Sequence, residues 1–252
     1  RILAPFGGQF MARTEVPRLE HPEYAFADSR DEMRKAIREN IYYGAHLIKV
    51  VADAKPYHYT EEDLRFIREE AARAGRRVAV HCGTLEAARA AAAAGVASIE
   101  HGWNLDDATM ALMKGNGVVL VSTDFTVAAL QEAGADAARA ERLHQRYVAR
   151  LKRAFQAGVT VAFGTDLMGS GNRGRMALDY VDSFLEAGVP PLETLRAMTA
   201  NGAKLLGVES ERGFLKPGCA ADLIALEGDP LKDPQALKRV RFVMKNGRVV
   251  TP

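Results

Sequence analysis

The chain has 252 residues, of which 48% are hydrophobic and 26% charged, and its formal net charge at pH 7 is +2. Such a balanced charge gives no general attraction to nucleic acid or to an anionic membrane surface. The two cysteines are too few for a disulfide framework or for a cysteine-based zinc site. No apolar run approaches the ~20 residues that span a bilayer. We therefore expect neither a nucleic-acid partner nor a membrane partner.

Short apolar runs rich in β-branched residues recur along the chain and predict parallel strands covered by helices. The runs are 1–6, 45–51, 77–82, 96–101, 117–123 and 159–166. Helical segments lie between them, and two have clear boundaries. The first is expected to begin after the N-cap Thr60, with Asp63 at its third position, and to stop at Gly75. The second is expected to begin after the N-cap Thr84 and to stop at Gly95. This alternation predicts βαβ units and an α/β fold.

The pattern changes near Gly207, where alternating segments and a Lys-Asn-Gly turn signal predict a small β unit. We expect a catalytic, partial (β/α) barrel over 1–207 and a C-terminal β-sandwich segment over 208–252. Six candidate parallel strands are present, whereas a closed (β/α)₈ TIM barrel has eight.

Four polar residues follow or end different predicted strands: Lys49, His81, His101 and Asp166. Because the carboxyl ends of parallel strands share one edge of a sheet, these side chains can line one pocket. Imidazoles and a carboxylate are ligands of hydrolytic metal sites. Taken singly, each histidine is more simply a structural residue, Lys49 a salt-bridge partner and Asp166 a helix cap.

A lysine ammonium cannot bind a cation. Burial of Lys49 among Ile48, Val50 and Val51 would lower its pKa, because burial disfavours the charged form. The neutral amine could then add carbon dioxide to give a carbamate, whose two oxygens can bridge two metals.

The ordered series IKV, VAVHC, SIEHG and AFGTD, followed by PLETLRAMTANGAKLLG and GFLKPGCAADLIAL, closely resembles the amidohydrolase superfamily. The nearest branches are the imidazolonepropionase-related and prolidase-like hydrolases. The resemblance implies a TIM barrel with two zinc ions, bridged by carbamylated Lys49. It implies His81 and His101 as ligands of the second metal, and Asp166 as a ligand of the first metal and the proton-shuttling base.

The family's His-x-His pair at the end of strand 1 does not occur in this sequence. By pattern, the segment 1–6 corresponds to strand 3, so strands 3–8 are present and strands 1 and 2 are missing. We therefore expect this chain, which begins at Arg1, to be the C-terminal part of a longer polypeptide. Any signal peptide would lie upstream, so the compartment is open, with the cytoplasm favoured.

Three further residues are candidates for contact with a substrate. Tyr59 could donate its hydroxyl to a carbonyl oxygen that develops negative charge, or it could simply pack against its loop. Arg173 and Arg175, in a glycine-rich segment after Asp166, could bind a substrate carboxylate.

Cys82 follows a histidine within a strand and should be a buried thiol on the opposite face.

The leading hypothesis is a binuclear metal-dependent hydrolase that cleaves amide or peptide C–N bonds of small substrates, as a dipeptidase or carboxypeptidase does, through a metal-bound hydroxide. A cyclic-amide hydrolase of the imidazolonepropionase type is the alternative within this class. A different reading is an inactive, non-catalytic barrel fragment. The expected partners are a small molecule or a short peptide, and homo-oligomerisation is compatible with the family.

Overall fold

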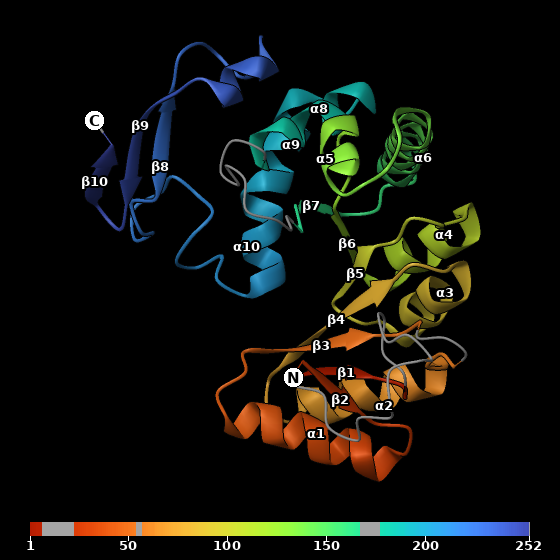
Figure 1. The fold of residues 1–252 in the computed structure, drawn as a ribbon. Helices are drawn as coiled ribbons and strands as arrows, with labels where there is room; N and C mark the ends of the chain where they lie inside the picture. The colour runs from red at the N-terminus through yellow and green to blue at the C-terminus, as the bar shows by residue number, and fades with distance from the viewer. Residues whose placement is uncertain (7–22, 54–56, 167–176, 252) are drawn as a thin grey trace. The chain divides into compact units, whose positions relative to one another are not determined.

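The computed structural model describes residues 1–6, 23–53, 57–166 and 177–251. They form two compact units, coloured along the chain in Figure 1. The first is Arg1–Val121 with Ala157–Thr160, and the second is Ser122–Gln156 with Val161–Pro252.

A parallel sheet of seven strands has the order β2-β1-β3-β4-β5-β6-β7. The strands are β1 (Ile2–Ala4), β2 (Tyr24–Phe26), β3 (Leu47–Val51), β4 (Arg77–Cys82), β5 (Ser98–His101), β6 (Val119–Ser122) and β7 (Val161–Phe163). The six predicted strands are all present, and β2 is additional.

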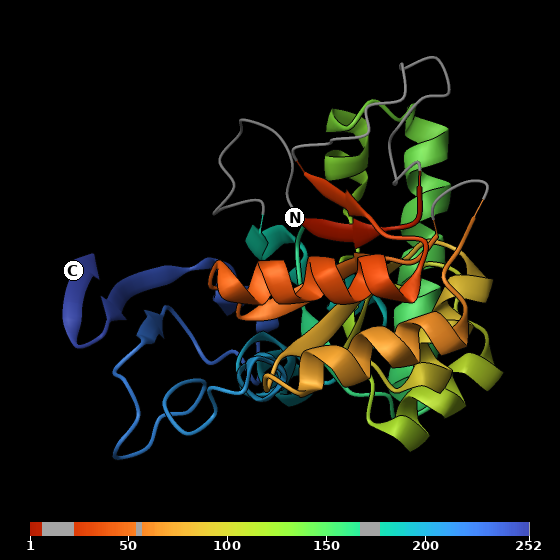
Figure 2. The same ribbon diagram turned by 90° about the horizontal axis from the view of Figure 1, so that it is seen from below.

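Four helices alternate with the strands of the first unit: α1 (Arg30–Tyr42), α2 (Glu61–Ala72), α3 (Leu85–Ala94) and α4 (Asp107–Asn116). Consecutive helices pack side by side, as α1 and α2 do in Figure 2. Alternate strand residues and the inward faces of these helices are fully buried, among them Ile48, Val50, Val80, Leu64 and Ile67. This apolar layer holds each strand end in place relative to its neighbours.

Both predicted N-caps and the predicted end of α3 are confirmed, whereas α2 ends at Ala72 with Arg73, not Gly75, as its C-cap. Thr60 caps α2 in a capping box with Asp63, and Thr84 caps α3 through the backbone N–H of Ala87. Gly95 ends α3 with φ of 68°, a left-handed conformation that glycine adopts without strain.

The second unit contains α5 (Val127–Glu132), α6 (Ala137–Gln156), α8 (Val181–Glu186), α9 (Pro191–Met198), α10 (Ala200–Leu206) and the 3₁₀ helix η1 (Pro234–Lys238). Its antiparallel sheet has the order β10-β9-β8, from β8 (Leu223–Leu226), β9 (Val240–Lys245) and β10 (Arg248–Thr251). The predicted turn joins β9 to β10, with Asn246 and Gly247 both at positive φ. The pattern change expected near Gly207 coincides with the end of α10, while the domain boundary itself stays a prediction.

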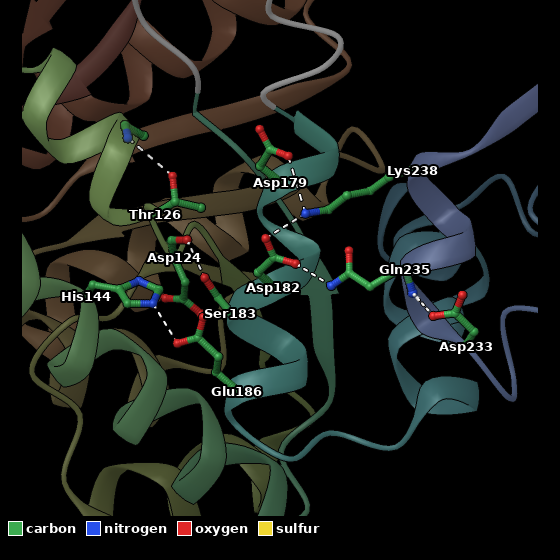
Figure 3. A network of polar contacts seen from close by, with 11 residues as sticks. Asp124, Thr126, His144, Asp179, Asp182, Ser183, Glu186, Asp233, Gln235 and Lys238 are labelled. Atoms are coloured by element: carbon green, nitrogen blue, oxygen red, sulfur yellow. Dashed lines mark hydrogen bonds and ion pairs between the residues drawn. The ribbon is translucent and has the colours of Figure 1, made fainter.

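Helix η1 is attached to α8 through Asp182. Its carboxylate accepts hydrogen bonds from Lys238 (2.6 Å) and Gln235 (2.8 Å), which Figure 3 shows from close by. The segment that follows β8 is thus anchored to the helical part of the second unit. No helix among the described residues combines the length and the apolarity needed to cross a membrane.

Candidate active site

Lys49 lies in the middle of β3, beside Ala79 of β4. Its neighbours Ile48 and Val50 are buried as expected, but they point to the opposite face of the strand. Lys49 itself is half-buried. Val51, which shares the face of Lys49, is 1% exposed, so desolvation of the amine stays a prediction.

His81 and His101 meet at the ends of β4 and β5. Each is 5% exposed, and their ring centroids lie 4.7 Å apart in an edge-to-face arrangement. In the strand register His101 pairs with Cys82, so a regular strand would place the two histidines on opposite faces. His101 instead has φ of 67°, a left-handed backbone conformation that is costly for a non-glycine residue. This turn brings the two imidazoles together.

Gly102 continues the turn with φ of 56°. A Cβ atom there would lie 3.0 Å from Leu105 Cδ1 and 3.2 Å from Leu120 Cδ1. The His-Gly pair at the end of β5 thus has a steric reason: Gly102 adopts a left-handed conformation in a crowded space, which suits a residue without a side chain.

Two residues at these strand ends were not recognised from the sequence. Trp103 packs with its ring centroid 4.7 Å from that of His101 and 5.9 Å from that of His81. Asp53 follows β3, and its Oδ1 lies 3.6 Å from Nε2 of His81. The signal for Asp53 was its place four residues after Lys49, directly beyond the predicted strand.

Cys82 is a buried free thiol, as predicted. Burial raises its pKa well above the ordinary value, with a smaller contribution from the negative charge of Asp53. The thiol is therefore kept neutral and packs as a small apolar side chain.

Tyr59 is 4% exposed, and its hydroxyl donates a hydrogen bond of 2.6 Å to the backbone carbonyl of Ala27. Burial raises its pKa, and the nearby carboxylates of Asp28 and Asp63 add to the effect. Of the two roles expected for Tyr59, this arrangement corresponds to packing within the protein. A contact with a substrate would require the Ala27 bond to break first.

Asp166 belongs to the second unit, three residues beyond the end of β7, and it has φ of 47°. Tyr180, which is 1% exposed, lies in the same unit. Burial raises the pKa of Tyr180, and the negative charges of Asp166 and Asp124 raise it further. Arg173 and Arg175 lie outside the described residues.

A buried polar network follows β6 in the second unit (Figure 3). Asp124 accepts side-chain hydrogen bonds from Ser122 and Arg150. Its backbone carbonyl accepts a hydrogen bond of 3.0 Å from Ser183, which Figure 3 shows. His144 Nδ1 lies 3.0 Å from the carbonyl of Phe125, and its Nε2 lies 2.8 Å from Glu186. This histidine therefore has a structural role, in keeping with its absence from the predicted site.

The donor atoms at the ends of β3, β4 and β5 suit a divalent cation. Imidazole nitrogens and carboxylate oxygens are common zinc ligands, and Oδ1 of Asp53 is buried without a hydrogen-bond partner among the described residues. Within the part of the chain that the structure describes, however, no three His, Cys, Asp or Glu side chains are arranged to hold a metal ion. The first unit thus presents a partial ligand set of suitable chemistry.

The model of the amidohydrolase family matches residues 2–250. The chain belongs to the amidohydrolase family. Members generally use divalent metals, in agreement with the donor atoms described above.

Curated relatives in the amidohydrolase family include ochratoxinase from Aspergillus niger, which is 33% identical over 242 residues. The match covers 88% of this chain and 50% of that protein. Imidazolonepropionase from Symbiobacterium thermophilum is 30% identical, over 96% of this chain and 55% of that protein. The chain thus spans about half the length of the curated relatives it matches.

Solved structures agree with the family assignment. A prolidase complexed with N-methylphosphonate-L-proline superposes with a TM-score of 0.85 at 28% identity, over 100% of this chain and 68% of that one. A Xaa-Pro dipeptidase with bound methionine gives a TM-score of 0.85 at 27% identity, over 100% and 67% of the two chains. The α/β fold of the amidohydrolase TIM-barrel type, with a small C-terminal β-sheet, is therefore confirmed.

Proposed function

We propose that this amidohydrolase is a metal-dependent enzyme that cleaves the C–N bond of dipeptides and N-acyl amino acids. The observation that carries the proposal is the meeting of His81 and His101 at the ends of adjacent strands, made possible by the left-handed backbone at His101. The similarity to a prolidase and a Xaa-Pro dipeptidase supports dipeptides, including those with a C-terminal proline, as substrates.

In this proposal His81 and His101 would hold a divalent cation through ring nitrogens, and Lys49 as a carbamate would supply anionic oxygens to the metal site. Zinc is the favoured metal for imidazole and oxygen donors. A bound cation would lower the pKa of coordinated water to about 7 and would polarise the substrate carbonyl.

Asp166 is the general base and acid of the proposed reaction. Its carboxylate takes a proton from the attacking water and delivers it to the leaving nitrogen, which departs as a neutral amine. Arg173 and Arg175 are the proposed partners of the substrate carboxylate.

A cyclic amide is the second candidate substrate, favoured by the 30% identity to an imidazolonepropionase over 96% of the chain. Opening a ring amide uses the same attack on a carbonyl carbon, so the two candidates differ in the pocket that holds the substrate.

The test is hydrolysis by the full-length protein after loading with Zn²⁺ or Co²⁺, on a panel of Xaa-Pro dipeptides, N-acetyl amino acids and five-membered cyclic amides. Metal content is measured in parallel. Asp166→Asn should keep its metal and turn over about 10²–10⁴-fold more slowly, the usual contribution of a general acid–base residue. A metal-loaded protein that hydrolyses none of the panel would overturn the proposal. A protein that takes up no metal would favour a non-catalytic role.

A further inference from the structure

Asp53 uses its two carboxylate oxygens in different ways. Oδ2 accepts backbone hydrogen bonds from Gly83 (2.6 Å) and Thr84 (2.8 Å), the two residues that lead into α3. Oδ1 has no hydrogen-bond partner among the described residues and lies 3.6 Å from Nε2 of His81. The side chains of Asp53 and His81 are only 5% and 7% exposed. A buried carboxylate oxygen without a partner is costly, so its position next to an imidazole calls for an explanation.

The turn at Gly83 is held from both sides. Its N–H donates to Asp53, and its carbonyl accepts a hydrogen bond of 2.5 Å from the side chain of Asn104, in the loop after β5. A Cβ atom at Gly83 would lie 3.0 Å from Oδ2 of Asp53, a tight contact that the glycine avoids. The loops that follow β3, β4 and β5 are thereby joined, and Oδ1 of Asp53 is fixed in its orientation toward His81.

The chemistry of the two partners follows from this fixed orientation. A carboxylate only accepts hydrogen bonds, so Oδ1 favours the form of His81 that carries its proton on Nε2. The lone pair of the neutral ring then lies on Nδ1, which becomes the metal-binding nitrogen. At 3.6 Å the contact is longer than a hydrogen bond, and a small rotation of the imidazole would close it.

We propose that Asp53 is a positioning residue that holds His81 in the Nε2–H tautomer and so presents Nδ1 to a divalent cation. The part that concerns the cation rests on the proposed function. Carboxylate partners of this kind orient metal-binding histidines and raise their basicity. Asp53 acts through His81 and does not touch the substrate.

The first measurement is the tautomer of His81 in the metal-free protein, by two-bond ¹H–¹⁵N NMR at about pH 8, well above the ordinary histidine pKa of about 6.5. The wild type should show Nε2–H. Asp53→Asn keeps an amide oxygen for the N–H groups of Gly83 and Thr84, but it turns an NH₂ donor toward Nε2. The population should therefore shift to Nδ1–H.

Asn104→Ala is the matched control. It loosens the same turn from the other side and leaves the carboxylate next to His81 in place. The tautomer should stay Nε2–H in this variant. Zinc affinity, measured by competition with a chelator, should fall about 10–100-fold in Asp53→Asn and much less in Asn104→Ala.

The outcomes separate this inference from the proposed function. Three results would each overturn the positioning role, even in an active enzyme. His81 of the wild type could carry its proton on Nδ1, or the tautomer could stay the same in Asp53→Asn. Zinc affinity could also fall as much in Asn104→Ala as in Asp53→Asn. The expected tautomers in a protein that binds no zinc would overturn the proposed function and the part concerning the cation. The orientation of His81 by Asp53 would then stand alone.

Discussion

The guanidinium of Arg150 donates a hydrogen bond to the carboxylate of Asp124, and each of the two residues is only 1% exposed. Arg150 is a buried residue of α6. Burial raises the pKa of Asp124, and the positive charge of Arg150 opposes this shift. Since Nε and Nη1 of Arg150 have no hydrogen-bond partner among the described residues, the cation depends on Asp124 for its compensation.

Breaking this pair on one side should strongly destabilise the second unit. Arg150→Met leaves the Asp124 carboxylate buried without its cation, and we expect a loss of about 3–5 kcal/mol in the free energy of unfolding. Urea denaturation measures this loss. Arg142→Met, at an exposed position of the same helix, should change stability by less than about 0.5 kcal/mol. The double variant Asp124→Leu, Arg150→Met should recover much of the loss, since no buried charge remains.

The variant Tyr59→Phe distinguishes a structural role of the Tyr59 hydroxyl from a role in catalysis. Because the hydroxyl is bonded to the carbonyl of Ala27, its removal should lower the free energy of unfolding by about 1–3 kcal/mol and leave the turnover rate nearly unchanged. Thermal unfolding and steady-state kinetics on the same preparation measure both effects. Turnover slowed by about 10²-fold, with unaltered stability, would instead assign the hydroxyl to the substrate.

Isotope labelling and a Lys49 variant test whether the amine of Lys49 carries a carbamate. Growth or incubation with ¹³C-bicarbonate should give a carbamate carbon signal in the metal-loaded protein, and Lys49→Met should lose both that signal and most of the bound metal. Retention of metal and hydrolysis in Lys49→Met would contradict the bridging role. Lys35→Met, on the exposed face of α1, is a control for general effects of losing a lysine.

The lowered pKa of Asp222 predicts that acid destabilises the C-terminal sheet. Hydrogen bonds from Lys245, the backbone N–H of Asn246 and Arg212 lower its pKa from 3.8 to about 2. A lowered pKa means that the unfolded chain binds the proton more readily, so the stabilisation is complete above about pH 4 and is lost as pH falls toward about 2. Amide hydrogen exchange in β9 and β10 should increase over that range. Asp222→Asn should show the faster exchange already at neutral pH, with little further change on acidification.

Much of the fold could be read from local patterns. The β-branched runs gave all six predicted strands, and Thr60, Thr84 and Gly95 marked helix ends correctly because caps depend on neighbouring backbone groups. The same periodicity placed His81 and His101 at strand ends. It could not reveal that their rings meet, because that contact depends on the left-handed turn at His101.

The sequence by itself determined the order of strands and helices, the family, and the residue types available for chemistry, because these depend on short-range patterns and on a distinctive series of motifs. Only the tertiary structure showed that Lys49 is half-buried, that Tyr59 is bonded to Ala27, and that Asp53 faces His81. The last two contacts join residues that lie far apart in the sequence. Such partners are chosen by the packing of strands and loops against one another, which no local window contains.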